Sequence, residues 1–232
     1  MIVQHVHFSY KNNDKYTTES ILKQTKKDCI KIGFPYCYFT MYNPQSMYLY
    51  DNNKKQIETP CPYHDKLLIQ LFLKLGKGAI EEYIKCIKGN HYSKDDLVKI
   101  LNDNIRELTK REEEFSKSVS VDKLVRVSEY IIANHDKQLL FYTFNHPTKY
   151  LYRYISDNIL GHLGFSKGKY PEEFDPENIR MVPVHGSLKS LVGFEIGDVV
   201  KIHKDAIDLR TYVEVFVDFY ETVDKEVLMK YV

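Results

Sequence analysis

The chain of 232 residues has no tryptophan and only four cysteines, Cys29, Cys37, Cys61 and Cys86. None of them forms a CxxC pair, and no histidine near them has the spacing of a zinc site. The amino terminus, MIVQHVHFSY, also lacks the charged region and long apolar run of a signal peptide. These absences predict a cytoplasmic protein with reduced thiols.

Long hydrophobic runs and an excess charge of one sign are missing too. No stretch approaches the ~20 apolar residues of a membrane span, so no transmembrane segment is expected. Lys and Arg number 33 against 32 Asp and Glu, which gives a formal net charge of +1. A protein that binds nucleic acid through its phosphates usually carries a basic excess, and a nucleic acid partner is therefore not expected.

Three common catalytic motifs are also absent from the sequence. There is no GxGxxG dinucleotide fingerprint, no phosphate-binding Walker loop and no GxSxG nucleophile elbow. This removes the commonest dehydrogenase, kinase and α/β-hydrolase interpretations.

The periodicity of apolar residues predicts an α/β fold. MIVQHVHF alternates like a strand, and KQLLFYTF is a short apolar run typical of a buried strand. Helical patterns fill residues 61–76, 78–89, 93–118, 120–136 and 146–164, and the carboxyl-terminal TYVEVFVDFYETVDKEVLMKYV favours a helix. We expect Ser93 to cap the third of these helices, and Ser120 or Asp122 to cap the fourth. We expect one domain over residues 1–232, a small and mainly parallel sheet surrounded by helices with a helix-rich middle. A purely helical bundle is the alternative.

The most informative unit is FYTFNHPTKY, where an apolar run stops and a helical pattern begins. Ligands of open α/β sheets bind beyond the carboxyl ends of strands, where helix amino termini present free N–H groups. We expect Asn145 to cap the helix and His146 to lie exposed at its mouth, where the helix dipole lowers the pKa of the imidazole. The alternative is that NHP is only capping chemistry.

Histidine also recurs in QHVH near the amino terminus. His5 and His7 share one face of the expected strand, but a metal site needs a further ligand, so a polar edge strand is the better interpretation. No metal is expected. Gln4, on the other face, could hydrogen-bond a ligand or support a loop.

Three further segments each have a functional and a structural interpretation. FPYCYFTMYNPQ could form one wall of a sugar or adenine pocket or a buried strand and turn, and its Cys37 is a candidate nucleophile only with an activating neighbour. In CPYHD, capping by Asp65 is favoured over a dyad with His64. In RELTKREEEF, Arg106, Lys110 and Arg111 could bind phosphate, although a solvated face is favoured.

The order of these segments resembles the WcbI family of capsular polysaccharide biosynthesis proteins. The resemblance rests on a Q-x-V strand, the FPYCYFTMYNPQ segment, a long helix ending at Arg111 and Glu112, LFYTFNHPTKYLYRYISDNILGHLG, and VPVHGSL. It implies an α/β fold that binds coenzyme A and acetylates a surface polysaccharide. By position it assigns catalysis to His146 and Asn145, and cofactor binding to Gln4, Arg111 and Tyr42.

This chain lacks the Gly-Asn-Cys-Gln-like opening segment that is usual in the family. It could therefore be a relative truncated at the amino terminus, one part of an oligomer or of a complex with an upstream partner chain, or an inactive form. Three functions follow as hypotheses. The first is a coenzyme A-dependent acetyltransferase acting on a glycan or nucleotide-sugar acceptor. The others are a non-catalytic coenzyme A- or glycan-binding module and an SGNH-like ester hydrolase.

Overall fold

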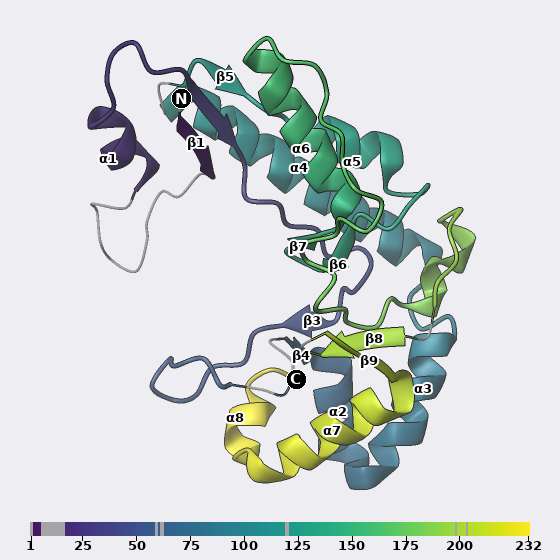
Figure 1. Cartoon of the computed structure of the whole chain (residues 1–232). Helices are drawn as coiled ribbons and strands as arrows, with labels where there is room; N and C mark the ends of the chain where they lie inside the picture. The colour runs from purple at the N-terminus through teal and green to yellow at the C-terminus, as the bar shows by residue number, and fades with distance from the viewer. Residues whose placement is uncertain are drawn as a thin grey trace.

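A three-stranded parallel sheet lies at one end of the molecule (Figure 1). The computed structural model describes residues 2–5, 17–58, 60, 63–118, 121–197, 199–202 and 204–232, with only the backbone at 2–5 and 118. The strands are ordered β1 (Ile2–His5), β2 (Lys31–Phe34) and β5 (Lys123–Leu124). Gly33 of β2 is paired with Gln4 and Leu124. A Cβ atom at Gly33 would lie 2.3 Å from the Phe115 ring, so glycine is required for this close approach.

Helices surround this sheet and bury the first of two large hydrophobic cores, which we call the sheet-side core. The helices involved are α4 (Lys94–Ser118), α5 (Ser128–Asn134) and α6 (Lys149–His162). Leu22 of α1 (Thr18–Lys23) packs with Phe115 of α4 in a small separate cluster. The fully buried members include Ile32, Phe39, Leu97, Val127, Phe141 and Leu151. The apolar positions of α4 and α6 recur at helical spacing and face this core, which explains why the two segments fold as amphipathic helices.

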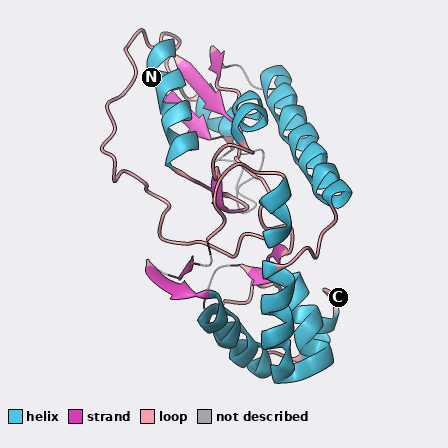
Figure 2. Ribbon diagram, turned by 90° about the vertical axis from the view of Figure 1, so that its right-hand side faces the viewer, coloured by secondary structure: helices cyan, strands magenta, loops and turns pink. Residues whose placement is uncertain are grey.

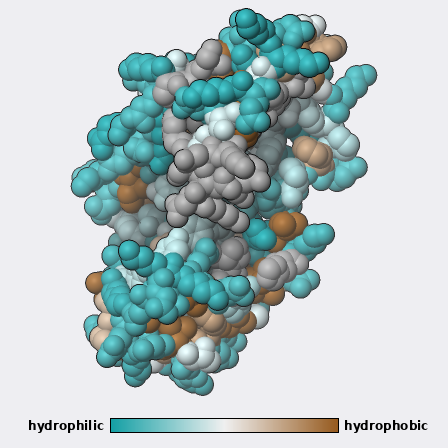
Figure 3. All heavy atoms as spheres, turned by 90° about the vertical axis from the view of Figure 1, so that its left-hand side faces the viewer, coloured by the Kyte–Doolittle hydropathy of each residue, from teal (hydrophilic) through white to brown (hydrophobic). Residues whose placement is uncertain are grey.

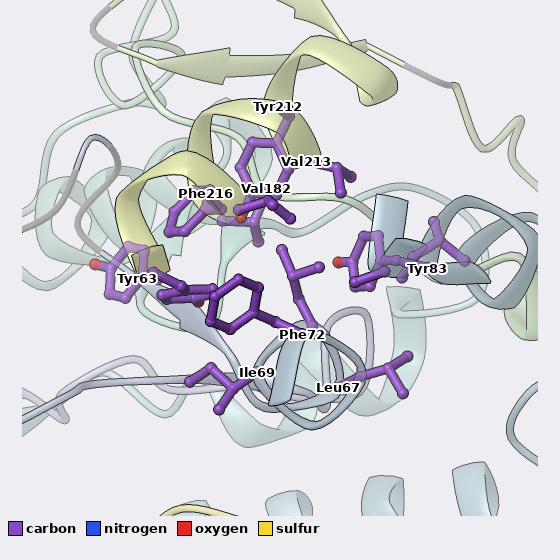
Figure 4. Packing of buried hydrophobic residues seen from close by; sticks show 14 of the residues in the cluster. Tyr63, Leu67, Ile69, Phe72, Tyr83, Val182, Tyr212, Val213 and Phe216 are labelled. Carbon is purple, nitrogen blue, oxygen red and sulfur yellow. The ribbon is translucent and has the colours of Figure 1, made fainter. Parts of the chain in front are cut away.

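The second core, which we call the helical core, lies at the other end of the molecule. It is built by α2 (Lys66–Leu75), a 3₁₀ turn (Gly76–Gly78), α3 (Ala79–Lys88), α7 (Leu209–Thr222) and α8 (Lys225–Met229). Two short antiparallel pairs border it, β3 (Ser46–Met47) with β4 (His64–Asp65) and β8 (Val199–Ile202) with β9 (Asp205–Asp208). Figure 4 shows Phe72 of α2 and Phe216 of α7 among the aromatic and aliphatic side chains packed between these helices.

A small hairpin joins the two cores. It consists of β6 (Phe141–Thr143) and β7 (His146–Pro147), paired antiparallel with a register shift between Phe141 and Thr143. Phe141 is buried in the sheet-side core, whereas Phe144 is buried in the helical core. A second connection runs through the 3₁₀ turn Gly186–Ser190, which contacts both α3 and α4. The seam between the cores is thus fixed by side chains that enter each of them.

The predicted α/β class with a helix-rich middle is confirmed. Figure 2 shows short strands flanked by many helices, and the parallel sheet rules out a purely helical bundle. Three antiparallel pairs accompany that sheet, and β8 and β9 do not join it. The carboxyl-terminal helix is confirmed as α7 and α8.

Two of the predicted helix starts were wrong. Residues 123–124 form strand β5, so the helix predicted over 120–136 begins only at Ser128. Asp122 does not cap it, and Ser120 lies outside the described residues. The N-cap of α6 is Thr148 rather than Asn145, because His146 and Pro147 pair as a strand before the helix begins. The caps predicted at Ser93 and Asp65 are confirmed by bonds to the N–H groups of Asp96 and Leu68.

On the face shown in Figure 3, hydrophilic side chains cover most of the area and hydrophobic ones form scattered groups. Within the described ranges, no helix combines the length and the apolar character that crossing a bilayer requires.

A buried carboxylate ties α4 to α5. Glu112 is 0% exposed, and its Oε1 accepts hydrogen bonds from the backbone N–H groups of Val127 (2.7 Å) and Ser128 (3.0 Å). Its Oε2 accepts from the Ser128 hydroxyl at 2.5 Å. Val127 offers no side-chain cap of its own. Glu112 therefore serves as the cap of α5 from a neighbouring helix, since it satisfies the free N–H groups at that helix start.

We expect Glu112→Ala to lower the free energy of unfolding by about 2–4 kcal/mol, because it removes three hydrogen bonds and leaves buried N–H groups unpaired. Glu113→Ala, at the exposed neighbouring position, should change it by no more than about 0.5 kcal/mol. Urea titration followed by circular dichroism measures both. Equal stability of the two variants would contradict the role of Glu112.

Candidate functional site

His146 lies at the seam between the two cores, with a side chain that is 16% exposed. The expectation that it lies exposed at the mouth of a helix was therefore wrong, because its backbone pairs in β7 and its ring is largely buried. The residue directly follows the turn of the β6–β7 hairpin, where its backbone is paired with Thr143. The carboxyl end of β2 leads into Tyr36 and Tyr38 near the same place, since Tyr36 contacts Asn145. The site thus lies beyond the carboxyl end of a parallel strand, where α/β folds commonly bind ligands.

Both ring nitrogens of His146 have polar neighbours. Nδ1 lies 2.9 Å from the Tyr63 hydroxyl and 2.7 Å from the Thr143 hydroxyl. Both hydroxyls also donate to Oδ1 of Asn145. We assign both hydroxyl protons to Asn145, and each hydroxyl oxygen then accepts from Nδ1–H. This network places the imidazole proton on Nδ1 and leaves the lone pair at Nε2.

Two charged side chains face Nε2 of His146. The Arg180 guanidinium lies 3.4 Å away through Nη1, and the Glu177 carboxylate lies 3.7 Å away through Oε2. Burial lowers the pKa of His146 from its ordinary value, Glu177 raises it in part, and Arg180 lowers it. The imidazole is therefore neutral near pH 7 and can accept a proton at Nε2. Once protonated, it can pair with Glu177.

Asn145 is the centre of a tyrosine network. Its Oδ1 accepts from Tyr63 and Thr143, and its Nδ2 donates to the hydroxyls of Tyr36 (2.6 Å) and Tyr48 (3.1 Å). All four hydrogen-bonding positions of the amide, two lone pairs and two N–H groups, are therefore engaged. Asn145 thus fixes the orientation of Tyr63, and through Tyr63 that of His146.

Aromatic rings form the surface next to this network. Tyr63 packs edge-on against Phe144 and His146, with ring centroids 4.6 Å and 5.6 Å apart. Tyr48 contacts both Tyr63 and Phe144, and Tyr36 is 37% exposed. These rings present flat apolar faces with polar edges, which suit a ligand of mixed character.

The loop that follows α6 brings the charged residues to His146. Asp175 accepts a hydrogen bond from the Tyr142 hydroxyl and another from the Lys149 N–H at 3.2 Å. Glu177 accepts from the Tyr152 hydroxyl at 3.3 Å. These bonds hold the segment 175–180 against the start of α6, and they fix Glu177 beside His146.

The residues that the sequence assigned to cofactor binding are dispersed. The backbone of Gln4 lies in β1, and its side chain is outside the described part of the structure. Arg111 is 34% exposed, donates to Glu107 at 2.8 Å and lies over the Tyr38 ring at 5.9 Å. Tyr38 contacts Phe144, which contacts Tyr63, so two rings separate Arg111 from the His146 network.

Tyr42 occupies a different environment from the expected pocket wall. It is 0% exposed, and its hydroxyl donates to the carbonyl oxygen of His135 at 2.7 Å. Its ring packs against Phe39 and Phe194. Tyr42 is thus a member of the sheet-side core and not of an open surface.

The other candidates also have structural surroundings. Cys37 is buried, and burial together with Glu112 raises the pKa of its thiol to about 12, so it is no nucleophile. His64 stacks on Tyr220, and burial lowers the pKa of its imidazole to about 4. Asp65 instead caps α2, so the two residues have different structural roles. His7 lies outside the described residues. Among those described, no group of three or more His, Cys, Asp or Glu could hold a metal ion.

Several residues of the site were not predicted from the sequence. Thr143 lies two residues before Asn145 in FYTFNHPTKY, and Tyr63 lies in CPYHD, so both belong to segments in which other residues were predicted to have a role. Glu177 and Arg180 lie in a loop rich in proline and charge, where no periodicity marks any position. Only the folded chain places them beside His146.

Titration of His146 tests this arrangement. We expect its imidazole to titrate below 6.5, its ordinary value. Glu177→Gln should lower the pKa further, because the raising carboxylate is removed, and Arg180→Gln should raise it. Proton NMR of the imidazole, assigned with His146→Gln, measures all three. A shift of the same sign in both variants would rule out the described geometry.

Comparisons with known proteins place this fold. Among solved structures, the chain is similar to WcbI, described as a novel polysaccharide biosynthesis enzyme and as the native protein without a disulfide bond between coenzyme A and one of its cysteines. The TM-score is 0.81 at 18% identity, over 99% of this chain and 74% of that one. No curated protein gives a significant match. The family model for the polysaccharide biosynthesis enzyme WcbI matches residues 1–168, and the chain therefore belongs to the WcbI family.

Proposed function

We propose that the protein is a coenzyme A-dependent acetyltransferase that acts on a hydroxyl group of a surface polysaccharide or of its precursor. The observation that carries the proposal is the imidazole of His146, neutral and with its lone pair at Nε2, at a polar and aromatic seam. Membership of a family of polysaccharide biosynthesis enzymes supports an acceptor of glycan character. If the acceptor is a soluble precursor, an enzyme that acetylates it would be located in the cytoplasm.

His146 would act as the general base. Nε2 would take the proton of the acceptor hydroxyl as its oxygen attacks the acyl carbon, and would return this proton to the sulfur atom that leaves when the C–S bond of the thioester breaks. The resulting imidazolium would be stabilised by Glu177, 3.7 Å from Nε2, while Tyr63 and Thr143 hold the ring through Nδ1. Asn145 would position the histidine through Tyr63 rather than contact the acyl group.

The residues around the seam fit coenzyme A in chemical type. The exposed faces of Tyr36 and Tyr48 suit an adenine ring or a pantetheine chain, and Arg111 suits phosphate groups. Arg180 has a buried Nε atom without a partner in the described structure, so it retains a donor for an anion. When bound, acetyl-coenzyme A supplies the activated acyl group as a thioester. The WcbI structure named with coenzyme A supports the choice of cofactor.

One observation favours a non-catalytic module that binds coenzyme A or glycan. Both nitrogens of His146 and the amide of Asn145 already have protein neighbours, as they would in a purely structural network. Binding without turnover would favour this module. An SGNH-like ester hydrolase would instead release acetate from simple acetyl esters and would need no coenzyme.

Coenzyme A should raise the melting temperature of the protein. A ligand that binds only the folded state at 100 times its Kd adds about 2.7 kcal/mol, or on the order of 5–10 °C for a chain of this size. Arg111→Ala should reduce the shift, because a cation near the seam is lost. Arg106→Ala, at a more exposed arginine on the same helix that pairs with Asp103, should leave it unchanged. Differential scanning fluorimetry provides the measurement, and the absence of any shift would argue against coenzyme A.

His146→Ala should lower the rate of acetyl transfer by about 10²- to 10⁴-fold, since a general base is removed. The melting temperature should change little, because the side chain is not part of either core. Release of free thiol from acetyl-coenzyme A, with UDP-glucose or short oligosaccharides as acceptors, follows the reaction. His91→Ala, at an exposed histidine outside this network, is the control. Full activity of His146→Ala would refute the mechanism.

A further inference from the structure

A second hollow, separate from the His146 network, lies along α6. Its volume is about 490 Å³, compared with about 140 Å³ for the hollow next to Arg111. It is bounded by one face of α6, by Tyr130 of α5 and by the loop that follows α6 at Lys167. The lining positions on α6 recur at three- and four-residue intervals from Tyr150 to Gly161, so they form one continuous face.

Three tyrosines provide fixed aromatic faces in this hollow. Tyr130 and Tyr154 are stacked, with centroids 4.3 Å apart and an angle of 22° between the rings. The hydroxyl of Tyr154 donates to the carbonyl oxygen of Arg126, and that of Tyr130 accepts from Gln138. Tyr150 is 37% exposed. The rings of Tyr130 and Tyr154 are thus held in place before any ligand arrives, which reduces the entropic cost of binding, and Tyr150 adds a more exposed ring.

The polar side chains of the hollow are held in place as well. Arg153 donates to the carbonyl oxygen of Pro171 at 2.9 Å and lies over the Tyr170 ring at 5.5 Å. Asp157 accepts through Oδ1 from the Gly168 N–H at 3.0 Å and from the Tyr170 hydroxyl at 2.8 Å. Its Oδ2 remains available as an acceptor. The loop after α6 therefore orients a guanidinium and a carboxylate toward the same space.

Flat rings beside oriented donors and acceptors match the chemistry of a sugar. The C–H face of a pyranose ring packs on an aromatic ring, and its hydroxyls need partners that both donate and accept. The charge of the hollow is biased toward positive, with Arg153 and Lys167 against Asp157 and with His162 alongside. This bias favours a sugar that carries an anionic group.

The loop after α6 links the hollow to the surroundings of His146. Lys149, next to Tyr150 at the start of α6, donates its N–H to Asp175 of this loop at 3.2 Å. Tyr142 in turn donates to Asp175, two residues before Glu177. A chain laid along α6, which is about 20 Å long, would lead from the hollow to the hairpin.

We propose that this hollow is a binding subsite for sugar units that bear an anionic group, next to the unit that is acetylated. The proposal rests on the proposed function for the identity of the reacting unit, whereas binding to the hollow can be measured without any reaction. The anionic group has two sources: a uronate in a polysaccharide, or the diphosphate of a nucleotide-linked sugar.

Binding of three probes to the full chain tests the proposal. The probes are a uronate-containing tetrasaccharide from hyaluronan, UDP-glucose and the neutral maltotetraose, each followed by calorimetry at low and high salt. We expect the hyaluronan fragment or UDP-glucose to bind at least 10-fold more tightly than maltotetraose, and more weakly at high salt. The tighter of the two identifies the source of the anionic group. Equal binding of all three would overturn the requirement for an anion.

Two surface variants locate the binding. Tyr150→Ala and Lys167→Glu should each weaken the anionic probe by at least 10-fold, with an unchanged melting temperature and an unchanged response to coenzyme A. Lys169→Glu, an exposed lysine two residues further along the same loop and outside the hollow, should have no effect. Absence of probe binding, or binding that ignores Tyr150 and Lys167, would overturn the subsite.

Measurements of acetyl-transfer kinetics test the subsite and the proposed catalytic role of His146 separately. In a transferase, Tyr150→Ala should raise KM for the oligosaccharide and leave kcat unchanged, whereas His146→Ala lowers kcat. If coenzyme A neither binds nor reacts, the proposed function fails. The subsite would still be tested by the binding of the three probes and by the effect of the two variants on that binding.

Discussion

The arrangement of this molecule depends on one short hairpin whose two phenylalanines are buried in different cores. Phe141 anchors β6 in the sheet-side core, and Phe144 anchors the turn in the helical core. Removing either ring from its core would cost several kcal/mol, so the backbone between them has little freedom. Asn145 and His146 follow directly, and they are consequently held at the seam whatever the surrounding loops do. The position of the polar network is thus a by-product of hydrophobic packing.

Burial at that seam also decides the chemistry that is possible there. A histidine removed from water is neutral because desolvation penalises its charged form, and the Arg180 charge adds to this effect. A carboxylate nearby limits the penalty and gives the imidazolium a partner. The hydroxyls on the opposite side of the ring select the tautomer. Each of these effects is modest alone, but they act together to give a base with a defined lone pair.

The parts of the structure that could be predicted from the sequence were those determined by residues close together along the chain. The caps at Asp65 and Ser93, the helical stripe of α4 and the strand at Phe141 all follow from neighbours a few residues apart. The position of His146 next to a buried strand was predicted for the same reason. The positions of Glu177 and Arg180 were not predicted, since the sequence of a loop without periodicity does not indicate which part of the fold the loop will contact. Asn145 was expected to cap α6 because proline follows so soon, yet the pairing of His146 with Thr143 delays the helix to Lys149.

The loop after α6 is fastened to that helix along its length. Gly168 is bound by Asp157, Pro171 by Arg153 and Asp175 by Lys149. Helix and loop therefore form one mechanical unit that carries the proposed subsite at one end and the charges around His146 at the other. Under these proposals, substitutions that preserve the ties would change the preferred ligand without disturbing the His146 network. Ligand specificity would then be free to diverge while the proposed chemistry stays the same.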